Sequence, residues 1–434
     1  MFAWIGRQAY RRRWLVVAAW ALLILAALPV LPSVEQPLKV GGFSSPDTEA
    51  AHAAAALQRD LGFSPSTMLV LFQSDRLRAT DAAFQAQVAA ALREVRDAPH
   101  VTSVVLPSAD SSLIAPDNHT AYAIVGIDAP PEEAQRDVPA FEAALQPPPD
   151  LTMLVAGGPA FYRDIEQVSQ EDLRRAELIA FPVALVALVL VFGSFVAAGV
   201  PLVIGGAGVA AVLLSVYWAA HATDLSIFVL NLATMLGLGL AVDYSLFITS
   251  RFREELQREP GDVPSAVERT IATAGRAVFF SGTTVLIGLG GLSLFSFMFL
   301  RSVGIAGVIV VLWSTLAALT LLPALLGIVG ERIDRLAVRK TPTGDERSHG
   351  FWATLSHWVM AHPVWVLVPT LTLLALLGLP FRDASISSPD ATILPERLPS
   401  RQAFDRIVAA YGPGEISPMA IVLESPTSIW TPQN

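Results

Sequence analysis

The sequence contains no cysteine, which excludes disulfide bonds, thiol catalysis and zinc sites with cysteine ligands. Charged side chains are also scarce. They make up 15% of the 434 residues, whereas hydrophobic residues make up 53%. Because a soluble domain carries about a quarter charged residues, this shortage predicts a membrane protein.

Other absences narrow the function. Only two lysines occur, Lys39 and Lys340, and no basic stripe is interleaved with aromatic residues, so nucleic acid is excluded as a partner. The phosphate-binding pattern GxxxxGK[ST] is missing, which argues against an ATP-driven pump. We therefore expect no cofactor and no bound metal. The richness in alanine, arginine and proline is typical of GC-rich DNA and indicates a bacterial source.

Apolar runs of roughly 18 or more residues are long enough to cross a membrane as helices. The first run follows three arginines, as a signal peptide would. However, its apolar core is longer than the roughly 7–15 residues usual for a signal peptide. The segment LPVLPS that follows it offers no A-x-A cleavage site. We therefore predict seven spans, at about 14–31, 176–198, 201–220, 227–249, 277–299, 302–329 and 363–381.

Basic residues near the span ends predict the orientation, because cytoplasmic segments carry an excess of arginine and lysine. With the N-terminus inside, the short outer connections contain His221 and Asp224 in one case and Arg301 in the other. The inner segments hold the basic clusters, at Arg7, Arg11, Arg12, Arg13, Arg251, Arg253, Arg258, Arg269, Arg276, Arg332, Arg335, Arg339 and Lys340. We expect a multi-pass protein of the bacterial cytoplasmic membrane.

The polar stretch between the first two spans is long enough to form its own domain. Its strand-like and alanine-rich helix-like runs follow the order β-α-β-β-α-β, which is the split βαβ, or ferredoxin-like, arrangement. The predicted orientation places this α/β porter domain outside the membrane. The runs lie at 67–73, 80–97, 101–106, 120–127, 131–145 and 151–156, with further helices flanking them at 47–61 and 159–173.

The chain also repeats part of itself. Residues 12–29 align with 363–380 at an offset of 351, and the strand-like segment that begins at Met68 recurs from Met419 at the same offset. The segment SSPD recurs as well, at 44–47 and 387–390. We interpret this pattern as a tandem duplication that stops inside a second exported domain. On this interpretation the chain is either a fragment or the product of a truncated gene.

The expected organisation follows from these runs. It comprises the cytoplasmic N-terminus and first span at 1–32, the exported domain at 33–175, five spans at 176–330, a cytoplasmic linker at 331–362, the seventh span at 363–381 and the start of a second exported domain at 382–434.

The fourth span contains a carboxylate. The segment GLGLAVDYSLFITSRFREEL, at 237–256, places Asp243 roughly 8 Å to the cytoplasmic side of the span's midpoint. A central aspartate costs about 2.5–3.5 kcal/mol on insertion scales, so its presence indicates a function. Because desolvation favours the protonated form, we predict that Asp243 binds and releases a proton and that Tyr244 offers a hydroxyl. The alternative is a protonated aspartate that only bridges two helices.

Several neighbours of Asp243 are predicted to support it. Ser281 would face the carboxyl group, and Asn231 would line a polar path. For Thr283 and Thr284 the commoner outcome is a hydrogen bond to a carbonyl of their own helix. Small residues just before Asp243 would let another helix approach closely: they are Gly237, Gly239 and Ala241.

Three segments resemble the MMPL (mycobacterial membrane protein large) family of the RND superfamily: GLGLAVDYSLFITSRFREEL, GRAVFFSGTTVLIGLGGLSLF at 275–295, and LRSVGIAGVIVVLWSTLAALTLLPALLGIVGERID at 300–334. The resemblance covers the chain in order. It implies an RND-type helix bundle, driven by the proton-motive force, that exports lipids or other hydrophobic molecules. In such proteins an Asp-Tyr pair on the fourth span faces a second pair on the tenth. Asp243 and Tyr244 match the first pair, and the second would lie in the missing half.

We therefore expect a transporter rather than an enzyme. An intramembrane aspartyl protease needs two aspartates that share a proton, but these spans contain only one, and the motif reads GLAVD rather than GxGD. The expected partners are protons, a lipid or hydrophobic cargo and membrane lipids, and the protein partner would be a second copy or a complementary second half. The alternative is a non-transporting half that scaffolds or pairs with another half.

Overall fold

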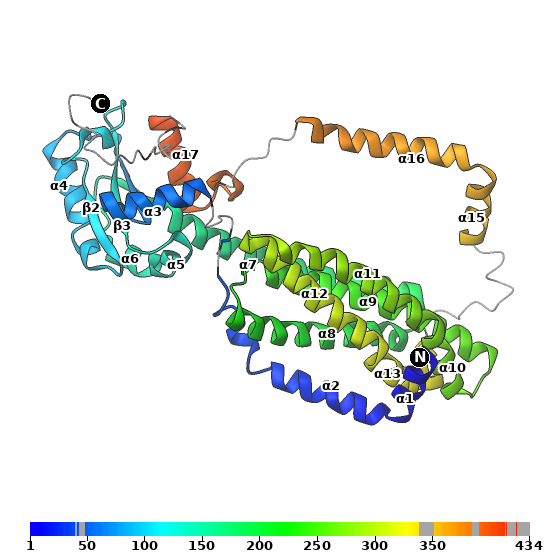
Figure 1. The fold of residues 1–434 in the computed structure, drawn as a ribbon. Coiled ribbons are helices and arrows are strands. Elements are labelled where there is room, and N and C mark those ends of the chain that lie inside the picture. Colours follow the sequence, from blue (N-terminus) through cyan, green and yellow to red (C-terminus); the bar gives the residue numbers. More distant parts are fainter. Residues whose placement is uncertain are drawn as a thin grey trace.

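The computed structural model describes residues 1–39, 41–42, 48–337, 351–383 and 390–412, together with 414 and 422 (Figure 1). These residues form a helix bundle, an α/β unit at one end of it, and a pair of helices that lies apart from both. The helices of the bundle are α1 (Phe2–Arg11), α2 (Arg13–Ala27), α7 (Gly158–Phe192), α8 (Phe195–Ala222), α9 (Val229–Arg258), α10 (Val263–Thr270), α11 (Arg276–Gly290), α12 (Met298–Leu319) and α13 (Leu321–Val329).

Six helices among the described residues are long and apolar enough to cross a membrane, so the chain is a multi-pass membrane protein. They correspond to the last six of the seven expected spans. The first expected span is α2, which has 15 residues and therefore measures roughly 22 Å, less than the roughly 30 Å of a bilayer core. The seventh is α16 (Pro363–Gly378), which follows α15 (Phe351–Ala361) and runs apart from the bundle (Figure 1).

The boundary between the second and third spans differs from the expected one. We expected the second span to end near residue 198, but α7 ends at Phe192. Gly193 follows with a positive φ of 66°, and Ser194 then caps α8 by accepting a hydrogen bond from Ala197 N. Because the residues on both sides are apolar, hydrophobicity alone could not locate this turn. The other end of α7 also differs, since the expected helix at 159–173 and the span form one helix of 35 residues.

Two other spans are irregular. The fifth is one helical rod, Val263–Leu294, in which α10 passes through a π turn (Ile271–Gly275) into α11. The sixth, expected to be continuous, breaks at Thr320, where φ is −120° and ψ is −63°. The reason is Pro323, which lacks an N–H and whose ring would clash with the carbonyl of Leu319, the last residue of α12.

The α/β unit contains a four-stranded sheet whose strand order is β2-β3-β1-β4. Each pair of neighbouring strands is antiparallel, and β1 pairs with both β3 and β4. Along the chain the elements are β1 (Ser66–Gln73), α4 (Ala82–Ala91), β2 (Val101–Val105), β3 (Thr120–Ile127), α5 (Pro131–Ala134), α6 (Val138–Ala144) and β4 (Thr152–Gly157), preceded by α3 (Glu49–Leu61). The four strands lie within one or two residues of the expected ones.

Alternation along β1 assigns its residues to the two faces of the sheet. Met68, Val70 and Phe72 are buried in one core with residues of α4 and α6. Leu71 lies on the opposite face, where it packs against residues from the far end of the chain.

That opposite face is covered by α17 (Pro399–Tyr411). Ala403 and Ile407 are buried against Leu71 and Tyr122 of the sheet. The Tyr411 hydroxyl donates to the carbonyl of Leu113 at 2.6 Å, and its ring meets the Tyr122 ring edge-on. At the other end of α17, Ser400 donates to the buried carboxylate of Asp164. The repeat segments at 44–47 and 387–389, and all of the segment after Met419 except residue 422, lie outside the described residues.

Candidate functional site

Asp243 lies on an exposed stripe of α9, whereas Tyr244 is buried in the bundle. The stripe consists of Met235, Gly239, Asp243 and Phe247, which follow one another at intervals of four residues and so share one face of the helix. Asp243 forms no hydrogen bond or ion pair with any other described residue. Its carboxylate therefore faces away from the helices that pack around α9.

The Tyr244 hydroxyl points into the bundle, where several other polar groups are also buried. The Ser281 hydroxyl of α11 lies near it, and the carboxyl group of Asp243 is the nearby acidic group. The hydroxyl nevertheless has no hydrogen-bond partner at normal geometry among the described residues. We expected Ser281 to face Asp243, but it lies near Tyr244, the residue that follows Asp243 in the sequence.

Four further hydroxyls of α9 and α12 are buried without partners among the described residues. They belong to Ser245 and Thr249 of α9 and to Ser314 and Thr315 of α12. Thr315 lies against α11, because a Cβ added at Gly282 would be 2.4 Å from Thr315 Oγ1. Buried polar groups normally have partners, and ordered water supplies them where the protein does not.

The small residues before Asp243 divide between two faces of α9. Gly237 and Ala241 are buried, and a Cβ added at Gly237 would be in ordinary contact with Val209 of α8 and Val310 of α12. Gly239 faces open space on the exposed stripe, with no atom within 4 Å of an added Cβ. Only Gly239 therefore leaves room for a further helix.

Asn231 does not lie beside Asp243. It is 12 residues away, or roughly 18 Å along the helix. Its side-chain amide donates to the Ser169 hydroxyl of α7 at 2.8 Å, which ties α9 to the helix that leaves the α/β unit. Thr283 and Thr284 donate to the carbonyls of Phe279 and Phe280, so the expectation that they bond to their own helix is confirmed.

The segment that leads into the α/β unit is also bonded to the start of α9. Lys39 N donates to Leu225 O, and Ile227 N donates to Lys39 O, both at 2.9 Å. Between them the fully buried Ser226 donates its hydroxyl to Gly41 O at 3.1 Å. We call Leu38, Lys39, Gly41 and Gly42, together with the turn 225–227, the linker clamp.

The linker clamp is held from α12 as well. Ser302 accepts a hydrogen bond from Ser226 N at 2.9 Å, and Phe299 N donates to Gly42 O at 3.1 Å. The contact is close, because a Cβ added at Gly42 would lie 2.9 Å from Phe299 N. The clamp and the Asn231–Ser169 bond together attach α9 to both chain segments that join the bundle to the α/β unit.

A network of ion pairs surrounds the opposite end of α9. The Glu255 side chain is 3% exposed and accepts from Arg251, Arg258 and Arg269 at 2.6–3.0 Å. The buried Arg253 donates to Phe192 O and pairs with Asp334. Arg253 and Glu255 are both buried, so at this end of α9 two charged side chains point into the protein.

Two acidic residues lie close together where the linker meets α7. Gln170 donates to Glu35 at 3.1 Å and to Glu166 at 3.4 Å. Burial, together with the negative charge of Glu35, raises the pKa of Glu166 above its ordinary value, and the positive charge of Arg136 opposes this effect.

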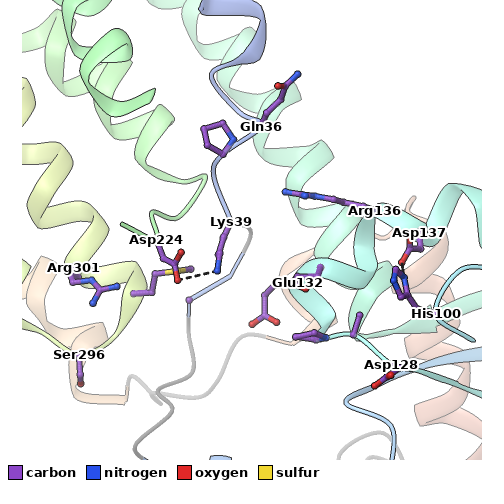
Figure 2. Close-up of a pocket in the computed structure, with 16 residues that line it drawn as sticks. Gln36, Lys39, His100, Asp128, Glu132, Arg136, Asp137, Asp224, Ser296 and Arg301 are labelled. Carbon is purple, nitrogen blue, oxygen red and sulfur yellow. Dashed lines mark hydrogen bonds and ion pairs between the residues drawn. The ribbon is translucent and has the colours of Figure 1, made fainter. Parts of the chain in front are cut away.

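A cavity of about 820 Å³ lies between the α/β unit and the ends of the bundle helices that are nearest to it (Figure 2). Asp224 and Arg301 line it from the bundle, whereas Glu132 and Arg136 line it from the α/β unit. Lys39 of the linker clamp reaches across to Asp224, with 3.1 Å between Nζ and Oδ2.

Comparison with known proteins places this arrangement in a family. The model of the MMPL family matches residues 42–366, which include β1 to β4 of the α/β unit, the bundle helices α7 to α13 and the start of α16. The chain belongs to the MMPL family. This membership confirms the resemblance carried by the segment around Asp243.

Relatives in this family share most of the chain. A putative membrane protein of Streptomyces coelicolor is 37% identical, over 99% of this chain and 61% of its own length. The trehalose monomycolate exporter MmpL3 of Mycobacterium tuberculosis is 30% identical, over 98% of this chain and 48% of its own length. The mycolic acid-containing lipids exporter MmpL11 of Mycolicibacterium smegmatis is 26% identical, over 96% of this chain and 44% of its own length. The chain thus spans about half the length of the MMPL relatives it matches.

Proposed function

We propose that this chain forms one half of a proton-driven transporter that exports lipids or other hydrophobic molecules across the cytoplasmic membrane. Two of the relatives are named as lipid exporters, which supports a lipid cargo. The proposal includes the orientation expected from the basic residues, with the N-terminus inside and the α/β unit outside. It is a transport function, with no chemical step on the cargo.

The observation that carries the proposal is the placement of Asp243. Within a membrane, a carboxylate on an open helix face is costly, and such groups normally face a bundle interior or a water-filled cavity. The face that carries Asp243 therefore needs a cover. Gly239, one turn away, leaves space for a helix to approach closely. We propose that a membrane segment from outside this chain packs on this stripe and completes the proton site.

The partnerless hydroxyls support a route for the proton on the inner side of α9. Tyr244 lies beside Asp243 in the sequence, and Ser245 and Thr249 continue along the buried face towards the cytoplasmic end. Waters bonded to these hydroxyls would form a chain on which a proton can move. Asp243 would then exchange its proton between this chain and the outer side.

The bonds at the other end of α9 support a way to use the proton. A shift of α9 on protonation would act on the linker clamp through Ser226 and on α7 through Asn231. Both segments lead directly into the α/β unit. We therefore propose that α9 transmits proton binding to this unit, and that Asn231 is a positioning residue in this coupling rather than a member of the relay.

The α/β unit is proposed to be a porter domain of the split βαβ type. Its element order, and the antiparallel strand order in which β3 lies between β1 and β2, support this assignment. The domain bounds expected from the sequence, with the porter domain at 33–175 and a second one starting near 382, are proposed with it.

The test is export of labelled lipid by bacteria that express the protein from its complete gene. Asp243→Asn keeps the size of the side chain but cannot take up and release a proton, so we expect export to be abolished at unchanged protein level in the membrane. Asp75→Asn, at an exposed position of the α/β unit, is the matched control and should export normally. Normal export by Asp243→Asn would show that the proton site lies elsewhere.

A further inference from the structure

Two carboxylates converge on one point where the linker meets α7. Glu35 lies in the linker after α2, and Glu166 lies on α7. The side-chain amide of Gln170, one turn further along α7, donates to Glu35 at 3.1 Å and to Glu166 at 3.4 Å. Neither carboxylate has an ion-pair partner among the described residues. The negative charges of this acidic pair therefore repel each other, and a neutral amide offsets only part of the repulsion.

An amide oxygen of the α/β unit is buried in the same place. Glu35, Glu166 and Gln135 line one cavity of about 360 Å³. Gln135 belongs to the 3-10 turn Gln135–Asp137 and is 5% exposed, and its Oε1 is buried without a hydrogen-bond partner among the described residues. Because a buried acceptor without a partner costs free energy, this oxygen favours a ligand that brings a donor or a positive charge.

The acidic pair and the Gln135 carbonyl together form a set of oxygen ligands. Carboxylate and amide oxygens bind hard cations, and Ca²⁺ takes roughly 6–8 of them at about 2.3–2.6 Å in a flexible geometry. Water can supply the positions that the protein does not, since the cavity has room for it. Mg²⁺ needs a nearly octahedral set at about 2.0–2.1 Å, which ligands from three separate chain segments provide less readily. The ligand set therefore favours Ca²⁺.

From the sequence we expected no bound metal. The described residues contain no group of three or more acidic or histidine side chains that could hold one. The set around Glu35 has only two carboxylates, and its third ligand is an amide whose burial depends on the fold. Composition and spacing therefore could not indicate this site.

Arg136 is a cation that competes for the acidic pair. It lines the same cavity, and Figure 2 shows its side chain extending from the α/β unit towards the linker. Its guanidinium lies near Glu166 but forms no ion pair with any described residue. A bound cation and Arg136 would repel each other, so Arg136 should lower the affinity of the site rather than contribute to it.

We propose that Glu35, Glu166 and the Gln135 carbonyl bind a calcium ion. The ion would connect the linker, α7 and the α/β unit, beside the linker clamp residues Leu38 and Ile227, which line the same cavity. Bound calcium would thus hold the α/β unit in one position relative to the bundle. The site goes beyond the proposed function, and it depends neither on proton coupling nor on the identity of the cargo.

The experiment measures calcium binding by isothermal titration calorimetry. The protein, expressed from its complete gene, is purified in detergent, stripped with a chelator and titrated at pH 8 with calcium chloride, magnesium chloride or the diamine putrescine. We expect calcium to bind most tightly, with a Kd of about 10⁻⁴–10⁻³ M, and to raise the melting temperature. Glu35→Gln and Glu166→Gln should each weaken calcium binding about tenfold, because each removes a charged ligand. Gln135→Met keeps the length of the side chain but removes the oxygen, so it should weaken binding about threefold.

Three further variants keep the result interpretable. Arg136→Gln should tighten calcium binding about threefold, because it removes the competing charge. Asp172→Asn, at an exposed position of α7, is the matched control and should bind calcium as the unmodified protein does. Asp243→Asn should also bind calcium normally, so failure of the calcium site and failure of the proton site give different results.

A melting temperature in chelator identifies any variant that is unfolded. No saturable calcium binding, tighter binding of putrescine or magnesium than of calcium, or unchanged calcium affinity in folded Glu35→Gln and Glu166→Gln would each overturn the proposal.

Discussion

Asp243 and Tyr244 are adjacent in the chain but lie in different environments. Successive residues of a helix point about 100° apart, so the carboxylate reaches the open stripe of α9 while the phenol enters the bundle. The pair can therefore connect the surface on which a further helix would pack with the polar groups of the interior. Neither residue could make this connection alone.

That Asp243 lies within a long apolar helix could be predicted from the sequence, but its surroundings could not. The apolar run fixes where a residue lies along the span. Which side of α9 faces α8 and α12 depends on side chains far away in the sequence, such as Val209 and Val310 against Gly237. For the same reason Asn231 was expected near the proton path, whereas its partner is Ser169 of α7.

Glu166 gives a prediction about pH. Its pKa is raised in the folded protein from a reference of 4.5 by burial and by Glu35, so the folded state binds this proton more tightly than the unfolded chain. The stabilisation is present below the unfolded pKa and is lost as the pH rises through the folded pKa. Glu166→Gln should therefore have a higher melting temperature than the unmodified protein at pH 8, with this gain disappearing at pH 4. Melting of the detergent-solubilised protein across this range measures the effect.

The control for this experiment is Glu49→Gln. Glu49 is exposed in the first turn of α3, so its substitution should leave the pH dependence unaltered. A constant difference between Glu166→Gln and the unmodified protein at every pH would contradict the assignment.

At the scale of elements, periodicity and turn residues located the sheet well. The strands at 66–73 and 120–127 coincide with the expected runs within one residue, because β-rich runs bounded by turn residues mark their ends. Helix ends that lie inside apolar sequence were harder to predict. The turn at Gly193 and Ser194 was missed because hydropathy does not change across it, although the Gly-Ser pair was the available signal.

The ion pairs around Glu255 hold α9 and α10 together at the end of α9 that lies away from the linker clamp. Glu255→Gln would leave Arg251, Arg258 and Arg269 without their common carboxylate. Because these arginines are partly exposed and can reach water, the expected loss is about 1–3 kcal/mol, less than for a fully buried pair. The measurement is the free energy of unfolding in detergent by chemical denaturation.

Glu254→Gln provides the matched comparison one residue away. Its side chain is 40% exposed and pairs with Arg251 at 2.9 Å. The free energy of unfolding should therefore fall by less than about 1 kcal/mol. Equal losses for the two variants would show that burial of Glu255 does not contribute.

At the scale of the whole molecule, α17 joins two distant parts of the sequence. In the sequence α17 follows the membrane helices, yet its apolar side chains pack on the sheet that precedes those helices. Ile407→Ala should cost about 2–5 kcal/mol, because it leaves a cavity against Leu71 and Tyr122. We expect faster hydrogen exchange in α17 and in β1, measured by mass spectrometry.

Val408→Ala, on the more exposed side of the same helix, is the control and should change exchange little. If Ile407→Ala accelerates exchange in α17 but leaves β1 unaffected, the helix packs on the sheet without stabilising it.

The contact between α17 and the sheet has a consequence for biosynthesis. The last strand of the sheet ends at Gly157 and α17 ends at Tyr411, so 254 residues must be translated between them (411 − 157). At about 5–20 residues per second this takes roughly 10–50 s. During that time Leu71, Tyr122 and Ala156 of the sheet remain without the cover that α17 provides. The α/β unit, which the ribosome begins first, is completed only after the membrane helices that follow it have been made.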